Sequence, residues 1–262
     1  MHNIDVIIIS LLTLVFIWWI LIEFYEEELD NQLDILSSKY RLKENLFMNE
    51  FLDKDNGIYN HNYYPELRRL HFVLKNNIVK VQKESIDTLL NKPKTLQRRS
   101  ENQWIGDAGD NYAKSLKNND AWIHGWTNDD DWLNYPILYN GEFYKYALKS
   151  LPTLCLYLSE IKDCVHVAGL SVLRPHGKIR PHSDVDQTYV KGLLNYHFNI
   201  KCPDKDKKSI LTINNKDIVQ ETGNSIMFDA GYLHSVDNKA DDYRIILFLD
   251  FKHPKSRVHE SK

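Results

Sequence analysis

Three short segments near the carboxyl end of the chain constrain its fold more than any other feature of the sequence. Residues 209–215 (SILTINN), 224–230 (NSIMFDA) and 243–251 (YRIILFLDF) are rich in β-branched and aromatic residues, and Asn, Asp and Gly separate them. Runs of this length between turn-forming residues are typical of antiparallel strands. We therefore expect this part of the chain to form an antiparallel sheet or barrel.

The last of these segments carries a cation next to its most apolar stretch. Arg244 is followed directly by Ile-Ile-Leu-Phe-Leu, and an unpaired charge buried there would be costly. A guanidinium in such a place is stabilised by a carboxylate, which its planar fork binds through two parallel hydrogen bonds. Arg244 is therefore a candidate carboxylate-binding residue.

A pair of residues upstream has a spacing that suits metal ligands. His182 and Asp184 are two positions apart, and alternate residues of an extended segment point to the same face. His234, 52 residues beyond His182, is the candidate third ligand. Two histidines and one carboxylate leave coordination positions open, as in non-haem Fe(II) oxygenases, whereas structural zinc would require a closed set rich in cysteine. A His-x-Asp spacing also arises by chance, so on its own it is a weak signal.

Several segments of this region, taken in order, make the signal more specific. They are LSVLRPHGKIRPHSD (170–184), NYHFNI (195–200), GNSIMFDAGYLHSVDNK (223–239) and RIILFLDFKHP (244–254). Together they resemble the catalytic core of the aspartyl/asparaginyl β-hydroxylase family of 2-oxoglutarate- and Fe(II)-dependent dioxygenases, which includes a lipid A hydroxylase branch. The resemblance implies a double-stranded β-helix, a jelly-roll or cupin-like core, over about residues 165–254.

The resemblance also implies a role for particular residues. Catalytic Fe(II) would be held by His182, Asp184 and His234. Arg244 would bind the distal carboxylate of the cosubstrate 2-oxoglutarate, and the cosubstrate pocket would be lined by Ser171 and His197. The reaction would consume O₂ and 2-oxoglutarate, release succinate and CO₂, and place a hydroxyl group on the substrate, with ascorbate as an optional addition.

The chain departs from the family pattern near the proposed metal ligands. The animal peptide hydroxylases lack a carboxylate at the place of Asp184, whereas the lipid A hydroxylase branch keeps one. Asn195 stands where the family usually has an arginine, and Lys191 is the nearby cation available to replace it. The segment DVDQTYVKG (184–192) is longer than the family norm.

Two further acidic residues are candidates near the site. Asp186 competes with Asp184 as the carboxylate ligand, although its spacing from His182 suits a strand less well. Asp229 either accepts a hydrogen bond from the second ring nitrogen of His234 or caps a turn.

An apolar segment at the amino end indicates a membrane anchor. Residues 6–22 (VIIISLLTLVFIWWILI) are uncharged and mostly apolar, close to the minimum length for crossing a bilayer as a helix. The alternatives are a cleaved signal peptide, which normally has a basic start and a small-residue cleavage site, and a buried core helix. We expect an uncleaved single-pass anchor within residues 1–30, spanning about residues 5–23. The acidic EFYEEELD that follows favours translocation of the catalytic domain to the lumenal side.

The middle of the chain is expected to be helical before the catalytic domain begins. We assign residues 31–100 to a stalk or accessory region, with helical spacing from 31 to about 57 and an amphipathic helix over 65–90 that begins with proline. Its basic residues would either contact anionic headgroups or form a solvated face. The dioxygenase domain is expected over 101–262, with a helix near 142–161 packed on its sheet.

Tryptophans and one histidine lie in the irregular segment before the core. Trp122, Trp126 and Trp132 either line a substrate cleft or staple loops to the core. His124 is either a metal ligand or, more commonly for such a residue, a buried histidine with ordinary hydrogen bonds.

Composition narrows the functional classes. The hydrophobic fraction of 43% and the charged fraction of 26% are those of a globular protein, and a net charge of −3 argues against nucleic-acid binding. Three cysteines without a C-x-x-C indicate neither a disulfide scaffold nor a zinc finger. A Cys155–Cys164 bridge in an oxidising lumen is the alternative to three buried thiols.

These observations predict a mainly β fold with flanking helices (α+β), preceded by a transmembrane helix and a helical region. The predicted activity is β-hydroxylation of Asp or Asn residues in proteins. Hydroxylation of a lipid acyl chain is an alternative, with a protein, a peptide or a membrane lipid as the partner. From other functional classes, a catalytically silent membrane-tethered binding module and a cupin-like metal hydrolase or isomerase are further alternatives.

Overall fold

The computed structural model describes residues 50–93, 96, 122–125, 131–184, 186–203 and 208–254. They belong to one compact unit, Glu50–Lys262. The expected anchor at residues 6–22, the first part of the expected stalk at residues 31–49, and Trp126 lie outside the described residues. Within those described ranges, no helix combines the length and the apolar character that crossing a bilayer requires.

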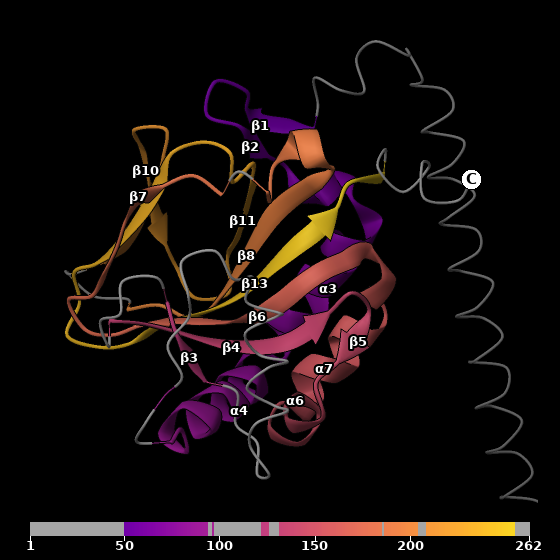
Figure 1. Cartoon of the computed structure of the whole chain (residues 1–262), viewed down its shortest axis with the longest axis vertical. Coiled ribbons are helices and arrows are strands. Elements are labelled where there is room, and N and C mark those ends of the chain that lie inside the picture. Colours follow the sequence, from indigo (N-terminus) through magenta and orange to yellow (C-terminus); the bar gives the residue numbers. More distant parts are fainter. Residues whose placement is uncertain are drawn as a thin grey trace, which may run out of the picture. The chain divides into compact units, whose positions relative to one another are not determined.

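The described residues form two antiparallel sheets (Figure 1). In spatial order, the large sheet contains β1 (Phe51–Asp53), β2 (Ile58–Tyr59), β11 (Ser225–Phe228), β8 (Leu193–Lys201), β13 (Arg244–Lys252), β6 (Val165–Leu173), β4 (Trp132–Tyr139) and β3 (Ile123–His124), with β5 (Glu142–Phe143) beside β4. The small sheet contains β10 (Lys216–Gln220), β9 (Ser209–Ile213), β12 (His234–Asn238) and β7 (Lys178–His182).

The order in which successive strands join the two sheets defines the architecture. From β6 onward it passes to the small sheet at β7, returns at β8, forms β9 and β10 in the small sheet, and then alternates through β11, β12 and β13. This is the strand order of a double-stranded β-helix, a form of jelly roll. The three segments that predicted strands are β9, β11 and β13, so the expected mainly β core is confirmed.

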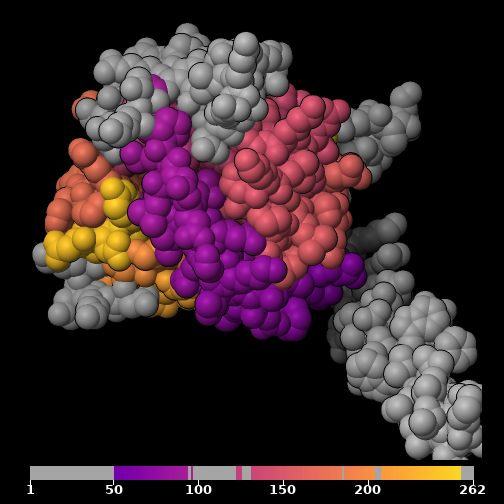
Figure 2. All heavy atoms as spheres, turned by 90° about the horizontal axis from the view of Figure 1, so that it is seen from below, coloured from indigo at the N-terminus to yellow at the C-terminus, as the bar shows by residue number. Residues whose placement is uncertain are grey.

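In the described part of the chain, four helices cover the face of the large sheet that is turned away from the small sheet: α3 (Pro65–Asn76), α4 (Ile78–Leu90), α6 (Lys145–Ser150) and α7 (Pro152–Ser159). Leu67 and Leu74 of α3 and Leu154 of α7 are buried in one apolar cluster with Phe198 and Leu247 of the sheet. Figure 2 shows these helical segments, purple and rose, side by side on one face of the molecule. Short 3₁₀ turns are η1 (His61–Tyr63), η2 (Lys162–Cys164) and η3 (Tyr189–Lys191).

The helices differ from the expected ones in their boundaries. The helix predicted over 65–90 is two helices, because Asn77 interrupts it. The Asn77 side chain donates to Val73 O at 2.9 Å, a local bond through which asparagine competes with helix continuation. The helix predicted near 142–161 begins as strand β5 and is then broken at Leu151, where Pro152 starts a new helix.

The helical spacing expected as far as residue 57 is wrong for its last residues, since Phe51–Asp53 is a strand. β2, α3 and α4 lie in the same compact unit as the two sheets. β2 pairs with β11 as a strand of the large sheet, and the apolar faces of α3 and α4 are buried against that sheet. All three cysteines are free thiols, so the Cys155–Cys164 bridge is absent.

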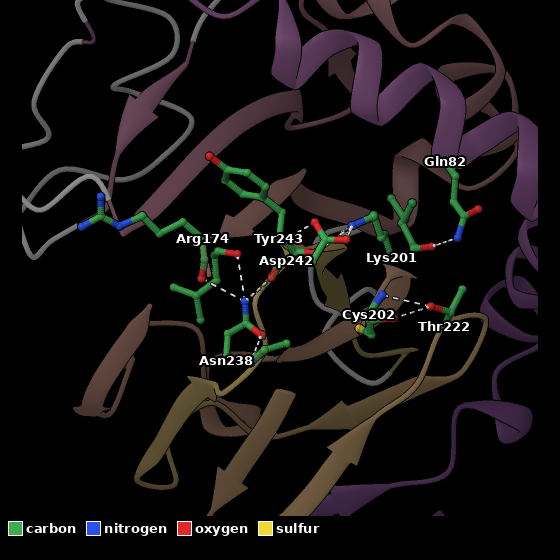
Figure 3. A network of polar contacts seen from close by, with 11 residues as sticks. Gln82, Arg174, Lys201, Cys202, Thr222, Asn238, Asp242 and Tyr243 are labelled. Atoms are coloured by element: carbon green, nitrogen blue, oxygen red, sulfur yellow. Dashed lines mark hydrogen bonds and ion pairs between the residues drawn. The ribbon is translucent and has the colours of Figure 1, made fainter. Parts of the chain in front are cut away.

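A polar network fixes the connection that leads into β13 (Figure 3). The buried Asn238 side chain donates to Arg174 O at 2.9 Å and to Asp242 O at 2.8 Å. Lys201 forms an ion pair with Asp242 and reaches Tyr243 O at 3.4 Å. The backbone that immediately precedes Arg244 is therefore held from both sides.

Candidate active site

Two histidines face each other across the β7–β12 strand pair. His182 and His234 are direct cross-strand partners, and their ring centroids are 4.2 Å apart. Asp184 follows His182 by two residues, and its backbone N–H donates to Ala230 O at 2.9 Å. The Asp184 carboxylate lies 4.0 Å from His182 Nε2 and 3.7 Å from His234 Nε2. One ligand atom from each of the three residues falls within 4.8 Å of the others.

The hydrogen bonds of the two rings select the tautomer that a metal requires. His182 Nδ1 donates to Arg180 O at 2.7 Å, and His234 Nδ1 donates to Tyr232 O at 2.9 Å. A carbonyl oxygen only accepts, so each Nδ1 carries a hydrogen, and Nε2 is the nitrogen through which each ring would bind a metal. Burial, followed by the proximity of His182, lowers the pKa of His234, which favours the neutral ring.

The other two acidic candidates have different places. Asp229 Oδ1 accepts from Tyr189 N at 3.1 Å and from Gly231 N at 2.9 Å. It therefore caps a turn, and the hypothesis that it holds the His234 ring is wrong, because Tyr232 O has that position. Asp186 is exposed and is absent from the cluster formed by described residues.

A cavity extends from the three clustered residues into the space between the sheets. Its lining comes from both sheets and from the segment after β7. The lining residues are Trp132, Asn134, Ser171, Ile179, His182, Asp184, Gln187, Asn195, His197, His234, Val236, Arg244 and Phe248. The structure thus brings all six residues predicted for the site into one cavity.

Arg244 is fully buried in this cavity. Its Nε donates to Gln220 Oε1 at 3.1 Å and its Nη1 donates to Ser171 Oγ at 3.3 Å. Its Nη2 has no hydrogen-bond partner among the described residues, and no carboxylate of those residues pairs with it. Burial lowers the pKa of Arg244 to about 10, so the guanidinium remains charged at neutral pH.

Three neighbouring side chains also keep unused hydrogen-bonding capacity. Asn134 Nδ2, Asn195 Oδ1 and His197 Nδ1 are buried without a partner in the described part of the chain. Buried polar atoms are normally paired, so this group of atoms is typical of a ligand site. Burial, and next the charge of Arg244, hold the pKa of His197 well below its usual range, which makes it a neutral ring.

Ser171 has a hydrogen available for a ligand. Its Oγ accepts from Trp132 Nε1 at 2.9 Å as well as from Arg244. A hydroxyl that accepts two hydrogen bonds keeps its own hydrogen to donate. Donors on Arg244, Ser171 and Asn134 therefore converge on a space that suits a carboxylate.

Two polar residues near Arg244 were not predicted from the sequence, and the two described tryptophans differ in their surroundings. Asn134 is a polar residue in the otherwise apolar β4, whereas Gln220 is the buried last residue of the mostly exposed β10. Trp132 lines the cavity, whereas Trp122 is fully buried and donates to Thr88 O at 3.2 Å, as expected of a staple. His124 is a buried histidine outside the cavity lining.

Asn195, which stands where the family usually has an arginine, is buried at the cavity. Asn195 Nδ2 donates to the buried Asp250 at 3.1 Å, and Asn195 lines the cavity. Lys191 is exposed in η3 and is not part of the lining. It does not take the place of the arginine that the resemblance predicts.

Comparison with known proteins gives one family match and two similar sequences. The model of the family described as Aspartyl/Asparaginyl beta-hydroxylase matches residues 75–254. The uncharacterized protein L888 of Acanthamoeba polyphaga mimivirus is 32% identical over 196 residues, which cover 74% of this chain and 69% of that protein. The ornithine lipid ester-linked acyl 2-hydroxylase of Rhizobium tropici is 25% identical over 126 residues, or 48% of this chain and 43% of that protein.

Two solved structures with distant likeness are both oxygenases by their descriptions. An oxidoreductase of the 2OG-Fe(II) oxygenase family from Burkholderia pseudomallei has 10% identity and a TM-score of 0.37, and the match covers 61% of this chain and 95% of that one. The viral collagen prolyl hydroxylase of Paramecium bursaria Chlorella virus-1, in complex with 2OG, has 14% identity and a TM-score of 0.33, covering 47% and 80%.

Proposed function

Since the chain belongs to the aspartyl/asparaginyl β-hydroxylase family, we propose that it is a dioxygenase that uses Fe(II) and 2-oxoglutarate to hydroxylate a C–H bond. The observation that carries this proposal is the cluster of His182, Asp184 and His234 beside a buried, unpaired face of Arg244. A binding module without chemistry would not need both features in one cavity.

The residues fit the metal and the cosubstrate. Two imidazoles whose Nδ1 atoms donate to main-chain carbonyls, together with one carboxylate, form the donor set of the two-histidine, one-carboxylate Fe(II) oxygenases. Bound Fe(II) with 2-oxoglutarate supplies the oxidising chemistry that uses O₂. The protein's part is to hold these reactants in place and to exclude competing reactions.

Each remaining residue has a task toward the cosubstrate. Arg244 would bind the distal carboxylate through Nη2, and Ser171 would donate its hydroxyl hydrogen to the same group. His197, kept neutral by burial and by Arg244, would offer a ring nitrogen without adding a second cation.

The substrate that the family points to is an Asp or Asn side chain in a protein or peptide, hydroxylated at its β-carbon. A lipid acyl chain is the second candidate. It is favoured by Asp184, which lies within 4.0 Å of both histidines and which the lipid A hydroxylase branch also keeps. The relative from Rhizobium tropici, named as a lipid acyl 2-hydroxylase, supports the same candidate.

We also propose that residues 6–22 anchor the enzyme in a membrane with its catalytic domain, at about residues 101–262, on the translocated side. The support is the length and apolar character of that segment and the acidic residues after it. Alkaline extraction of membranes, followed by protease protection of the catalytic domain, tests both parts. Release of the chain by alkali would refute the anchor.

The test of the activity starts with the full-length protein under anaerobic conditions. Addition of Fe(II) and 2-oxoglutarate should give the visible charge-transfer band of the chelate in wild type. The band should be absent in both His234→Ala and Arg244→Met, while His176→Ala, an exposed histidine paired with Asp241, should leave it unchanged. Folded wild-type protein that binds Fe(II) but gives no band would refute the oxygenase proposal.

Succinate release in the presence of candidate substrates then separates the two substrate classes. Peptides with Asp or Asn are compared with acyl lipids at matched concentration, and the product is located by mass spectrometry. A hydroxyl group on the β-carbon of a peptide residue supports the first candidate. A hydroxyl group on an acyl chain, with peptides inert, would replace it by the second.

A further inference from the structure

The contacts of Arg244 point to a second residue that governs the cosubstrate pocket. Gln220 is the last residue of β10 in the small sheet, whereas Arg244 is the first residue of β13 in the large sheet. The Gln220 side chain is 1% exposed, and its Oε1 accepts from Arg244 Nε at 3.1 Å. This contact bridges the two sheets at the end of the cavity.

The Gln220 amide is held in one orientation by neutral groups. Ser209 Oγ donates to Gln220 Oε1 at 3.0 Å, and Gln220 Nε2 donates to Asn199 Oδ1 at 3.2 Å. Ser209 and Asn199 are both buried. The amide oxygen therefore faces the guanidinium because both ends of the amide have fixed partners.

The backbone around both residues is also fixed. Thr222 Oγ1 accepts from Cys202 N at 2.9 Å and donates to Cys202 O at 3.1 Å, which ties the chain after β10 to the end of β8 (Figure 3). Asn238 holds the chain that leads to β13 in the same network. The distance between Gln220 and Arg244 is thus set by the fold and not only by their own bond.

The charge of the residue that pairs with Arg244 determines whether the guanidinium can still bind an anionic ligand. A buried guanidinium normally pairs with a carboxylate, and a glutamate has the same shape as the glutamine at position 220. Such a glutamate would neutralise Arg244 within the protein. Gln220 provides the acceptor without the charge, and it leaves the guanidinium with its net charge and its unpartnered Nη2.

We propose that Gln220 is a positioning residue that orients Arg244 without neutralising it, and that this neutrality gives the pocket its preference for a 2-oxo acid with a second, distal carboxylate. The inference rests on the proposed function, because it concerns the same cosubstrate. It adds a specific cause for selectivity: the neutral charge of one buried side chain that does not line the cavity.

The test compares two acids that differ only at the distal end. Isothermal titration of the full-length, Zn(II)-loaded protein measures binding of 2-oxoglutarate and of 2-oxopentanoate, which has the same chain length without the distal carboxylate. Gln220→Glu adds the charge at nearly constant shape, and Gln220→Met removes the acceptor without adding charge. Gln82→Glu is the matched control, since Gln82 donates to Ile200 O at 2.8 Å outside the cavity.

We expect Gln220→Glu to weaken 2-oxoglutarate binding by about 10- to 100-fold, the scale of losing a charge-assisted interaction, and to leave 2-oxopentanoate binding unchanged. Gln220→Met should cost only a few-fold, and Gln82→Glu should bind both acids like wild type. Gln220→Glu that binds 2-oxoglutarate as tightly as wild type would overturn the inference.

The neutral variant keeps the test decisive if Gln220→Glu fails to fold, which thermal melting will reveal. Gln220→Met should then keep the wild-type preference for 2-oxoglutarate over 2-oxopentanoate. Loss of that preference would show that the acceptor itself, rather than its lack of charge, sets selectivity, and would overturn the inference. Wild-type protein that binds Zn(II) and neither acid would refute the proposed function, and this inference with it.

Discussion

Replacing Arg244 by methionine should abolish cosubstrate binding without destabilising the ligand-free protein. Burial lowers the pKa of Arg244 from its usual range to about 10, which corresponds to about 3 kcal/mol against the charged form in the fold. At pH 7, below both values, the group is protonated in the folded and the unfolded chain. The folded state therefore carries the whole penalty, and removal of the charge relieves it.

The loss of hydrogen bonds opposes this gain. Arg244 makes one bond to Gln220 and one to Ser171, and each contributes about 1 kcal/mol net. Both partners keep a second bond, from Ser209 and from Trp132, so neither is left without a partner. On balance, the ligand-free variant should be as stable as wild type or about 1 kcal/mol more stable. A gain of about 1 kcal/mol corresponds to a rise of about 2–4 °C in melting temperature for a domain of this size.

The assay is chemical and thermal unfolding of full-length protein with a metal chelator, then with Zn(II) and 2-oxoglutarate. At a cosubstrate concentration of about 100 times Kd, wild type should gain about 3 kcal/mol and Arg244→Met should gain none from the cosubstrate. Arg174→Met is the control: Arg174 is 45% exposed and paired with Asp131, so its loss should cost about 1 kcal/mol or less. A ligand-free Arg244→Met that is more than about 2 kcal/mol less stable than wild type would refute the reasoning, because the guanidinium would then be a net stabiliser of the fold.

Three other changes have expected outcomes. Asp184→Ala should reduce Fe(II) affinity, measured anaerobically by titration, by more than the roughly 10- to 100-fold that loss of an outer-shell partner costs; unchanged affinity would exclude Asp184 as a ligand. Gly169→Ala should cost about 2–3 kcal/mol in urea unfolding, because its Cβ would lie 2.8 Å from Tyr135 O and 2.9 Å from Phe248 Cε1; a neutral effect would show that this central strand can shift. Burial, and next the neighbouring His71, lowers the pKa of His61 to about 4. As pH falls, the unfolded chain therefore binds a proton at this histidine before the folded chain does. The free energy of unfolding should fall as pH drops from about 6.5 to about 4. His61→Gln should flatten that slope in urea titrations, and an identical slope in the variant would assign the acid sensitivity to other groups.

Strands could be predicted better than helix boundaries, and the reason is local. The strand segments are short apolar runs between turn-forming residues, and each of those signals lies within the segment itself. The break at Asn77 depends on a side-chain bond to Val73 O, and the break at Leu151 depends on whether Pro152 begins a helix or kinks one. Helical periodicity continues across both positions, so the pattern alone favours a single helix.

The candidate ligands could be predicted because their chemistry is rare in such a context, whereas their supporting contacts could not. Asp229 was a reasonable partner for His234 by its position before that histidine, yet the carbonyl of Tyr232 has the contact. Main-chain carbonyls are present at every residue, so no sequence pattern marks the one that binds a ring. Gln220 was missed for a related reason, since its contact with Arg244 joins two sheets.

The face of each strand that lines the cavity is a separate problem, because most of the large sheet is buried on both faces. β6 and β13 are buried along almost their whole length. Apolar and polar residues therefore do not alternate along these strands, and the sequence pattern does not show which residues face the cavity. Isolated polar residues identify the cavity face. Asn134 lies directly opposite Ser171. His197 lies opposite Phe248, and Phe248 is on the same face of β13 as Arg244 because an even number of positions separates them. All four polar side chains are therefore on the cavity face. Against the helices an amide or a guanidinium would meet a mostly apolar cluster, and the argument that singled out Arg244 from its cost of burial applies equally to Asn134.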